Sequence, residues 1–426
     1  MLRLLLPLLI WLVWVAWSSM APAAERQVVA GGTALAEAIE NAGAGDTLRL
    51  GSGRHAGGIK ISKPLTIECA DGARIDAGGQ GTVLTVTGPD VTVTGCTITG
   101  SGSDHEGIDS GIRLLKGADR ARVTGNRLTG NLYGVDIHGA RDARVAGNVI
   151  EGRQDHRMND RGNGVYVWNA PGSDVVGNDI RWGRDGIFVN TSHSNRFVGN
   201  RFRDLRFAVH YMYANRSEVR GNLSIGNHLG YAVMYSRGVR IIDNVSVNDA
   251  EHGVMLNYTN SSEVRGNLVR GGGTKCLFIY NAHKNEIKGN RFERCETGVH
   301  FTAGSERNEI TGNAFVGNRT QVKYVGSKWV DWSAEGVGNY WSDFAGYDLD
   351  GNGIADTPYR PNDSMDHILW TQPAAKLLMG APAVQLVKWA QSAFPALLPG
   401  GVVDRAPLMQ PVEMSIPDWE ARHDGS

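Results

Sequence analysis

The sequence predicts an all-β fold, a right-handed parallel β-helix, and three observations lead to this prediction. An asparagine recurs at a nearly constant interval, an apolar residue stands three positions before it, and a strand with alternating apolar residues follows. A unit of short strands cannot bury its own apolar face, whereas copies stacked about 4.8 Å apart bury it jointly. We therefore expect a solenoid of coils of about 22 residues, with an N-terminal capping helix and a partly helical C-terminal extension.

Nine asparagines define the repeat. Their spacing is 22 or 23 residues, except for one step of 30 that carries an insertion, and they are Asn126, Asn148, Asn178, Asn200, Asn222, Asn244, Asn267, Asn290 and Asn313. Apolar residues fill the column three positions earlier, from Val123 to Ile310, and two further columns that begin at Val135 and Ile137. The last two alternate with variable residues, as expected for a strand with one buried face. Stacked asparagines suit a turn in which side-chain amides of successive coils bond to one another.

The ends of the chain differ from the repeat. Arg3 and an apolar run are followed by small residues and Glu25, which predicts a signal peptide over 1–24 and an exported protein. The β-helix is expected over 25–325, and the amphipathic stretch Thr33–Ala42 should cap its open N-terminal end. Residues 326–426 form a tryptophan-rich extension with a possible helix at Ala383–Ala393 and a loose tail.

Charge and cysteine content narrow the partners and the compartment. Lys and Arg number 43 against 44 Asp and Glu, so the chain lacks the positive excess that nucleic-acid binding requires. The four cysteines, Cys69, Cys96, Cys276 and Cys295, match no zinc pattern, and export would expose them to an oxidising compartment. A disulfide between Cys69 and Cys96 and a pair of buried thiols are both compatible with the sequence.

The outward positions of the alternating strand are richer in aromatic and methionine residues than a solvated face should be. Contiguous exposed side chains of this kind usually mark a binding surface. The residues predicted to dock a partner are Tyr213, Tyr235, Tyr258, Phe278, Tyr280 and His300.

Within this stripe, His210 and Met212 stand two residues apart on one strand, Met234 stacks on Met212 one coil further, and Met255 is diagonal to Met234. Neighbouring coils place such side chains about 5 Å apart, so they can converge on one ion. Thioether and imidazole ligands favour Cu(I), which predicts a transient copper site, with His228 as a possible further ligand. A docking surface without any metal is the alternative interpretation.

A second constellation has the spacing of a calcium-binding loop. Oxygen ligands at positions 1, 3, 5 and 9 are supplied by Asp348, Asp350, Asn352 and Asp356, with Gly353 at position 6. The bidentate carboxylate at position 12 is absent, so either a weak calcium site or a plain polar turn fits the pattern.

An enzymatic interpretation starts from carboxylates, because β-helix enzymes that cleave polysaccharides use acid and base pairs. Asp136 is the one carboxylate in the two outward columns of the alternating strand. No phosphate-binding loop and no nucleophile with an adjacent base is recognisable. A polysaccharide lyase or hydrolase, or a carbohydrate-binding protein, is therefore the second hypothesis, and an enzyme is not the first.

The segment after the repeat carries family-specific motifs. These are Gly338–Phe344 (GNYWSDF), the Asp348–Asp356 loop, Pro358–Asp363 (PYRPND), Pro373–Leu378 with Ala381–Gln385, and Val402–Met409 (VVDRAPLM). In these motifs, and in its signal and β-helix, the chain resembles the NosD family of nitrous oxide reductase maturation proteins. The resemblance implies a periplasmic copper-handling protein that is needed to assemble the copper–sulfur centre of the reductase.

The resemblance also implies three partners: an ABC-type transporter, a copper-carrying lipoprotein and nitrous oxide reductase itself. It implies membrane contact only through the transporter, and it supplies neither a catalytic residue nor a ligand motif. We therefore expect an accessory protein that receives or presents copper, and the copper ligands proposed above depend on the column geometry alone.

Overall fold

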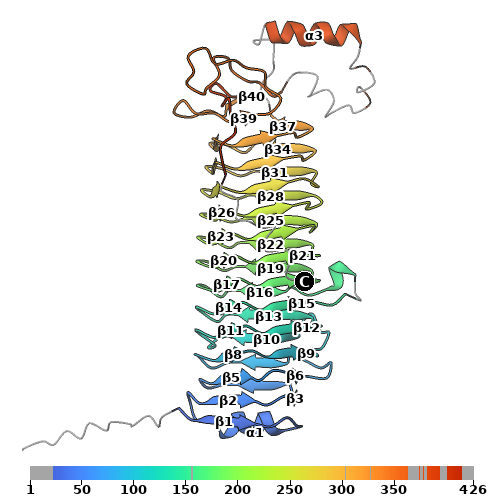
Figure 1. The fold of residues 1–426 in the computed structure, drawn as a ribbon, viewed down its shortest axis with the longest axis vertical. Coiled ribbons are helices and arrows are strands. Elements are labelled where there is room, and N and C mark those ends of the chain that lie inside the picture. The colour runs from blue at the N-terminus through green and yellow to red at the C-terminus, as the bar shows by residue number, and fades with distance from the viewer. Residues whose placement is uncertain are drawn as a thin grey trace, which may run out of the picture.

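The computed structural model describes residues 23–154, 157–302, 304–326, 328–362, 374, 378, 381–393 and 401–414. The predicted signal peptide and the end of the predicted tail therefore lie almost entirely outside the described residues. Within the described part, the chain winds into a tall parallel β-helix whose coils stack along one axis (Figure 1). The fold predicted from the repeat is confirmed.

Three parallel sheets of 13, 12 and 13 strands form the walls of the β-helix. The first sheet contains β1 (Glu25–Val28), β2 (Thr47–Leu50), β5 (Thr66–Cys69), β8 (Thr92–Thr94), β11 (Arg122–Thr124), β14 (Arg144–Ala146), β17 (Asp174–Val176), β20 (Arg196–Val198), β23 (Glu218–Arg220), β26 (Arg240–Ile242), β29 (Glu263–Arg265), β32 (Glu286–Lys288) and β35 (Glu309–Thr311).

The second sheet contains the longest strands. They are β4 (Ile59–Ile61), β7 (Leu84–Val86), β10 (Ser110–Leu115), β13 (Tyr133–His138), β16 (Val165–Trp168), β19 (Asp185–Asn190), β22 (Phe207–Met212), β25 (Leu229–Met234), β28 (His252–Asn257), β31 (Lys275–Tyr280), β34 (Thr297–Thr302) and β37 (Thr320–Val325).

The third sheet completes each coil. It contains β3 (Gly53–Ala56), β6 (Ala73–Asp76), β9 (Thr97–Thr99), β12 (Arg127–Thr129), β15 (Val149–Glu151), β18 (Asp179–Arg181), β21 (Arg201–Arg203), β24 (Leu223–Ile225), β27 (Val245–Val247), β30 (Leu268–Arg270), β33 (Arg291–Glu293), β36 (Ala314–Val316) and β39 (Tyr340–Trp341). The remaining elements are a 3-10 turn in the insertion, η1 (Met158–Asp160), and a two-stranded pair of β38 (Trp329–Asp331) and β40 (Gly401–Val403).

The predicted inward columns form one continuous core. Val123, Val135 and Ile137 and their equivalents in later coils have almost no solvent exposure. The asparagine column is also buried, and each side-chain amide donates to the asparagine of the next coil at 2.9–3.1 Å. Asn339 adds a last rung to this ladder. The ladder satisfies polar groups that would otherwise be costly to bury inside the turn.

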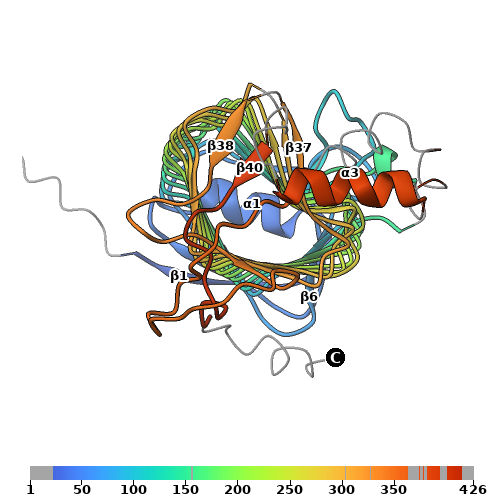
Figure 2. The same cartoon turned by 90° about the horizontal axis from the view of Figure 1, so that it is seen from above.

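Helix α1 (Ala34–Asn41) covers the N-terminal end of the stack, as predicted. Leu35 and Ile39 lie on its inner face and join the core, with exposures of 0% and 5%. The view along the axis shows the helix lying across the opening of the first coil (Figure 2). An uncovered coil would expose apolar side chains and strand edges, so this helix closes one end of the solenoid.

The other end is closed by two tryptophans and a returning C-terminal segment. Trp332 and Trp341 are buried, and Trp341 stacks on Phe315 with a centroid separation of 4.4 Å. The Trp341 indole donates to Asp404 at 2.8 Å, and the Asn339 amide donates to the same carboxylate at 2.7 Å. Burial raises the pKa of Asp404, against the opposing effect of these donors.

The predicted C-terminal helix is present as α3 (Pro382–Ala393), and it lies beyond the end of the stack in Figure 1. Leu386 and Trp389 are each 64% exposed, so these side chains are not buried in the cap. Among the described helices, none has the length and apolar character needed to cross a membrane.

All four cysteines are paired. Cys69 bonds to Cys96 and Cys276 bonds to Cys295, with Cα–Cα distances of 4.9 and 5.6 Å. The stacking of coils brings the members of each pair together, although they are 27 and 19 residues apart.

Candidate functional site

The outer face of the second sheet carries the residues that the sequence singled out for copper. In its parallel register, Met212 on β22 lies directly beside Met234 on β25. Ala232 separates His210 on β22 from Met255 on β28 in the neighbouring column. Adjacent coils are about 4.8 Å apart, so the four longer side chains surround the methyl group of Ala232.

Ala232 forms the floor of this arrangement. It points outward, since Tyr231 and Val233 on either side of it belong to the core. It has no solvent exposure nevertheless, although it lies outside the core cluster. The longer side chains next to it therefore cover it, and His210 and the three methionines are its neighbours on this face.

His210 is held in place by groups that the sequence analysis did not identify. Its Nδ1 lies 3.1 Å from a carboxylate oxygen of Asp185, and Arg206 donates two hydrogen bonds to the same carboxylate at 2.7 and 2.8 Å. The imidazole ring packs between Phe188 and Phe207, at centroid distances of 4.8 and 4.7 Å. The carboxylate fixes the ring orientation and leaves Nε2 as the nitrogen available to a metal.

Asp185 has no solvent exposure. The negative charge of its carboxylate strengthens the contact with His210. Burial alone would raise its pKa, but the contacts with His210 and Arg206 outweigh burial and lower the pKa below the ordinary value. The carboxylate is therefore ionised at neutral pH and remains an acceptor for the imidazole N–H.

His228 lies at the opposite end of the strand from the methionines. It directly precedes β25, whose last residue is Met234, so six residues separate the two side chains. At about 3.3 Å per residue this is roughly 20 Å. The His228 imidazole instead contacts Glu251 at 3.1 Å. The structure therefore does not bring His228 to the methionine group, and the possible ligand role predicted for it fails on distance.

The predicted docking residues form a continuous aromatic surface beside the methionines. Tyr213, Tyr235 and Tyr258 stack in successive coils, with centroid distances of 5.1 and 5.0 Å, and are 51%, 41% and 41% exposed. Tyr258 meets the edge of Tyr280 at 5.8 Å. We call Tyr213, Tyr235, Tyr258 and Tyr280 the tyrosine column.

The three stacked tyrosines occupy an unfavourable backbone conformation. Their φ angles are 52°, 49° and 50°, in the left-handed region that residues with a Cβ rarely adopt. Asn169 and Asn281 fill the same turn position in other coils, with φ of 46° and 45°. Asparagine tolerates this region better than tyrosine, so the tyrosines are retained here at a conformational cost.

Phe278 and His300 continue the aromatic surface toward the C-terminal coils. Phe278 lies 5.0 Å from His300 and 5.2 Å from His252, and the ammonium group of Lys275 stands 4.5 Å above the phenyl ring. Burial, followed by the charges of Lys275 and Lys323, lowers the pKa of His300 to about 4. His300 is therefore neutral at the pH of most cells.

Asp136, the carboxylate behind the enzymatic hypothesis, is fully buried beneath the N-terminal part of the same face. It forms an ion pair with Arg113 at 2.9 Å and lies 3.9 Å from His138. Burial raises the pKa of Asp136 to about 7, although Arg113 opposes the shift. Buried carboxylates with a cationic partner occur both as structural ion pairs and as catalytic acids. The geometry around Asp136 therefore does not by itself define an active site.

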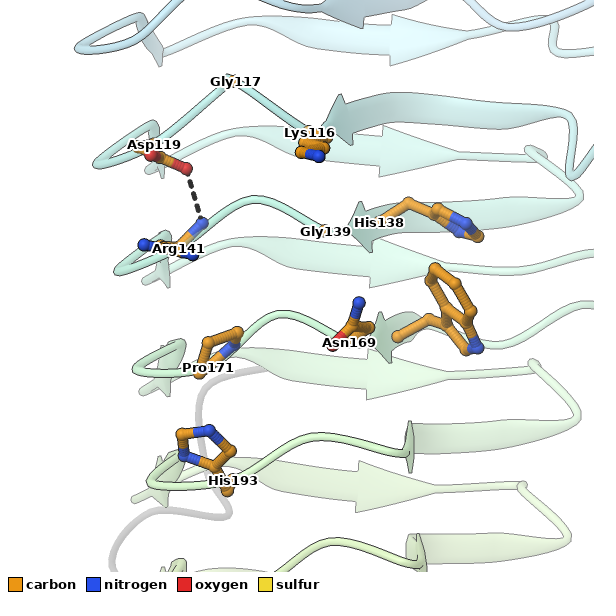
Figure 3. A pocket seen from close by; sticks show the side chains of 10 residues that line it. Lys116, Gly117, Asp119, His138, Gly139, Arg141, Asn169, Pro171 and His193 are labelled. Carbon is orange, nitrogen blue, oxygen red and sulfur yellow. Dashed lines mark hydrogen bonds between the residues drawn. The ribbon is translucent and has the colours of Figure 1, made fainter.

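A cavity of about 760 Å³ lies at the turn next to His138. Figure 3 shows the side chains around it, which come from successive coils and include Lys116, Arg141 and His193. His138 stacks on Trp168 with a centroid distance of 4.2 Å and forms one wall. The cavity is therefore lined by cationic, polar and aromatic groups together with the carboxylate of Asp119.

The predicted calcium loop is an exposed turn that binds its own backbone. Asp348 accepts amide hydrogen bonds from Gly351 and Gly353 at 2.8 Å, and Asp356 accepts one from Leu349 at 2.8 Å. Asn352 donates its side-chain amide to Asp350 at 2.9 Å. In the described part of the chain, no group of three or more His, Cys, Asp or Glu residues is arranged to hold a metal ion. Calcium binding stays a prediction.

The fold and this face define a parallel β-helix protein that presents a methionine, histidine and aromatic surface on one wall. Comparison with known proteins then identifies its family. The model of the NosD family, described as periplasmic copper-binding protein, matches residues 146–346.

Two curated relatives cover most of the chain. "Probable ABC transporter binding protein NosD" of Stutzerimonas stutzeri is 42% identical over 85% of this chain and 86% of the relative. The protein of the same name from Pseudomonas aeruginosa is 40% identical over 85% of this chain and 87% of the relative. The chain therefore belongs to the NosD family, a family of accessory proteins and not of enzymes.

Solved structures share the fold only. A PL6 alginate lyase in complex with a trisaccharide has a TM-score of 0.51 at 13% identity, over 72% of this chain and 89% of the lyase. An exopolygalacturonase from Thermotoga maritima has a TM-score of 0.51 at 11% identity, over 69% and 91%. At these identities the similarity shows a shared β-helix fold and gives no information about enzymatic activity.

Proposed function

We propose that this protein is a periplasmic accessory factor for the copper centre of nitrous oxide reductase. In this proposal it receives copper from a copper-carrying lipoprotein, holds it transiently as Cu(I) and presents it to the reductase while docked to an ABC-type transporter. The observation that supports the proposal is the register that places His210, Met212, Met234 and Met255 around the buried Ala232 on one outer face.

The chemistry of this ligand set favours Cu(I) over harder ions. Thioether sulfur and neutral imidazole nitrogen are soft, uncharged ligands that suit Cu(I). Calcium and magnesium instead bind oxygen ligands, mostly carboxylates. The contact between His210 and Asp185 resembles the carboxylate–histidine pairs that orient metal ligands in proteins. His210 is nearly buried while the methionines are partly exposed, so one side of the site is fixed and the other is open to a partner.

The tyrosine column supports a docking role beside this site. It continues along the same wall, since Tyr213 and Tyr235 directly follow the methionines that end β22 and β25. Aromatic side chains supply large contact areas and are enriched at protein interfaces. A copper site next to a docking surface allows the ion to pass directly between two proteins without release into solvent.

Anaerobic titration with Cu(I) tests the copper site directly. The test variant is Met212→Leu/Met234→Leu, which preserves side-chain volume and apolar character, and Met409→Leu/Met414→Leu in the C-terminal segment is the matched control. We expect the test variant to lose one bound copper ion, whereas the control should bind like the wild type. Equal stoichiometry and affinity in all three proteins would leave the face as a docking surface without metal.

Deletion in a denitrifying host tests the biological role. The reductase isolated from the deletion strain should lack copper in its catalytic centre and show no activity, and plasmid-borne wild type should restore both. A fully loaded, active reductase in the deletion strain would refute the maturation role.

A further inference from the structure

The turn that follows the second sheet carries an unusual row of cations. Two adjacent positions of this turn carry Arg120, which pairs with Asp90 at 2.7 Å, and five further exposed cations in different coils. These five are Arg141, Arg216, Arg237, Lys284 and Arg307. We call them the cation row. Within the described residues, none of the five forms a side-chain ion pair.

Four carboxylates share the same turn but form no side-chain ion pair with the row, and one of them, Asp90, pairs with Arg120. The Asp119 side chain accepts a hydrogen bond from the backbone amide of Arg141 at 2.9 Å, and Glu306 pairs with Lys328 at 3.4 Å. Asp142 acts on Arg120, whose pKa is raised mainly by Asp90. The coils from Arg216 to Lys284 contribute no carboxylate to this turn.

The first sheet shows that stacked cations on this scaffold can be paired. Arg144 and Arg196 both contact Asp174, at 3.2 and 3.4 Å, and Arg240 contacts Glu263 at 3.3 Å. Cations on that face therefore have acidic partners in neighbouring coils. Because the whole chain has a net charge of −1, the unpaired row is a local arrangement and not the result of a basic protein.

The cation row borders the tyrosine column. Arg216 follows Tyr213 by three residues, and Arg237 follows Tyr235 by two, so cation and ring share one turn in each coil. From Arg216 to Arg307 the row crosses four coil steps, about 19 Å, and from Arg141 it crosses seven, about 34 Å. This length is comparable to the width of an ordinary protein interface.

We propose that the cation row and the tyrosine column together dock a protein partner whose contact surface is acidic. Tyrosine and arginine are the residue types most enriched at the energetic centres of protein interfaces. Exposed cations steer an acidic surface during encounter, while the rings contribute contact area. The inference rests on the proposed docking function and specifies the charge of the partner.

A partner protein fits the row better than a linear anionic polymer. A polymer lying along the axis would meet one site per coil, whereas the coils of Ser194 and Ser261 place serine where neighbouring coils have Arg216 and Lys284. The N-terminal end of the row opens into the cavity lined by Lys116, Arg141 and His193 (Figure 3). A projecting acidic side chain of a folded partner suits such a hollow.

Charge reversal with a matched control tests the proposal. The row variant is Arg216→Glu/Arg237→Glu/Lys284→Glu, and the control variant on the first sheet is Arg220→Glu/Arg240→Glu/Arg265→Glu. Both change the net charge by the same amount. Binding to purified nitrous oxide reductase and to the transporter in nanodiscs is measured at low and high salt, with thermal unfolding and Cu(I) stoichiometry measured in parallel.

We expect the row variant to bind at least one of these partners tenfold or more weakly at low salt, and the difference to shrink at high salt. The control variant should stay within about twofold of wild type. Equal affinity of row variant and wild type, or equal weakening by both variants, would overturn the proposal.

Two further probes separate other ligands from a protein. If the wild type binds alginate oligomers or anionic vesicles through the row but binds neither protein, the protein-partner assignment is overturned. Copper stoichiometry should be unchanged in the row variant. A wild type that binds both proteins but no copper would count against the proposed copper site and leave this inference standing.

Discussion

The first and second sheets are two walls of the same coils, yet their outer faces have opposite chemistry. Many outward residues of the first sheet are charged and form ion pairs along the stack, as Arg240 does with Glu263 and Lys288 with Glu309. Outward residues of the second sheet are methionine, histidine and aromatic side chains that stack on one another. Both walls share the strand spacing and contribute to one core.

The coil constrains the residue types at the inward and turn positions, whereas the outward positions accept residues of different chemistry. Exposed ion pairs contribute little stability each, so the first sheet mainly keeps that wall soluble. Exposed rings and thioethers carry an aggregation risk and, for Tyr213 and its neighbours, backbone strain. A wall that retains such residues is therefore the one where we expect function.

The largest effect should come from replacing the three strained tyrosines. The variant is Tyr213→Asn/Tyr235→Asn/Tyr258→Asn. Because Asn169 and Asn281 occupy the same turn position, stability should be unchanged or slightly higher. Affinity for the reductase or the transporter should fall about a hundredfold, since aromatic residues dominate interface energetics.

Surface plasmon resonance measures this loss, and Tyr347→Asn supplies the control. Tyr347 is 53% exposed but lies outside the second sheet, so its substitution should leave affinity unchanged. If the triple variant binds both partners as tightly as the wild type, the tyrosines of the second sheet do not form a docking surface.

Filling the floor of the candidate copper site should have the next largest effect. In Ala232→Phe, a phenyl ring would occupy the space between His210 and Met255. We expect Cu(I) affinity to fall more than tenfold, with the fold retained because the residue points outward. Ala146→Phe on the outer face of the first sheet is the matched substitution and should not affect copper. Competition with a chromogenic Cu(I) chelator measures both, and equal affinities would contradict the site.

A third prediction concerns the buried carboxylate of the second sheet. Burial raises the pKa of Asp136 to about 7 in the folded protein, whereas an unfolded chain releases this proton near the ordinary aspartate pKa of 3.8. The folded state therefore holds more protons between these values, and stability falls as pH rises from about 4 to about 7. Asp249, whose pKa burial raises to about 6, acts in the same direction.

Urea unfolding at several pH values tests this coupling. Asp136→Asn should remove its share of the decline and should be more stable than wild type at pH 7 by up to roughly 4 kcal/mol. Below pH 4 the two proteins should differ little. Parallel stability curves across this range would show that Asp136 is ionised in the folded protein.

The smallest effect is expected on the first sheet. Arg240→Ala/Glu263→Ala removes an exposed ion pair at 3.3 Å. The free energy of unfolding should change by less than about 0.5 kcal/mol, and copper and partner binding should not change. A loss of partner binding in this variant would mean that the docking surface reaches around to the first sheet.

The sequence by itself determined the architecture of this protein. In a solenoid each residue contacts its equivalent one coil away, so a constant period specifies the inward columns, the asparagine ladder and the register of Met212 with Met234. The amphipathic stretch that became α1 was recognisable for the same reason, because an open coil needs a cover.

Only the tertiary structure decided which outward groups act together. His210 is positioned by Asp185 and Arg206, which lie in other columns, and no period relates these residues. His228 is a possible further ligand by sequence, but it lies at the end of strand β25 opposite Met234. Asp404 closes the last coil by binding Trp341, 63 residues away. The direction of a side chain and contacts between distant segments, such as Asp404 with Trp341, depend on where strands begin and end in space. The spacing of the repeat does not determine these positions.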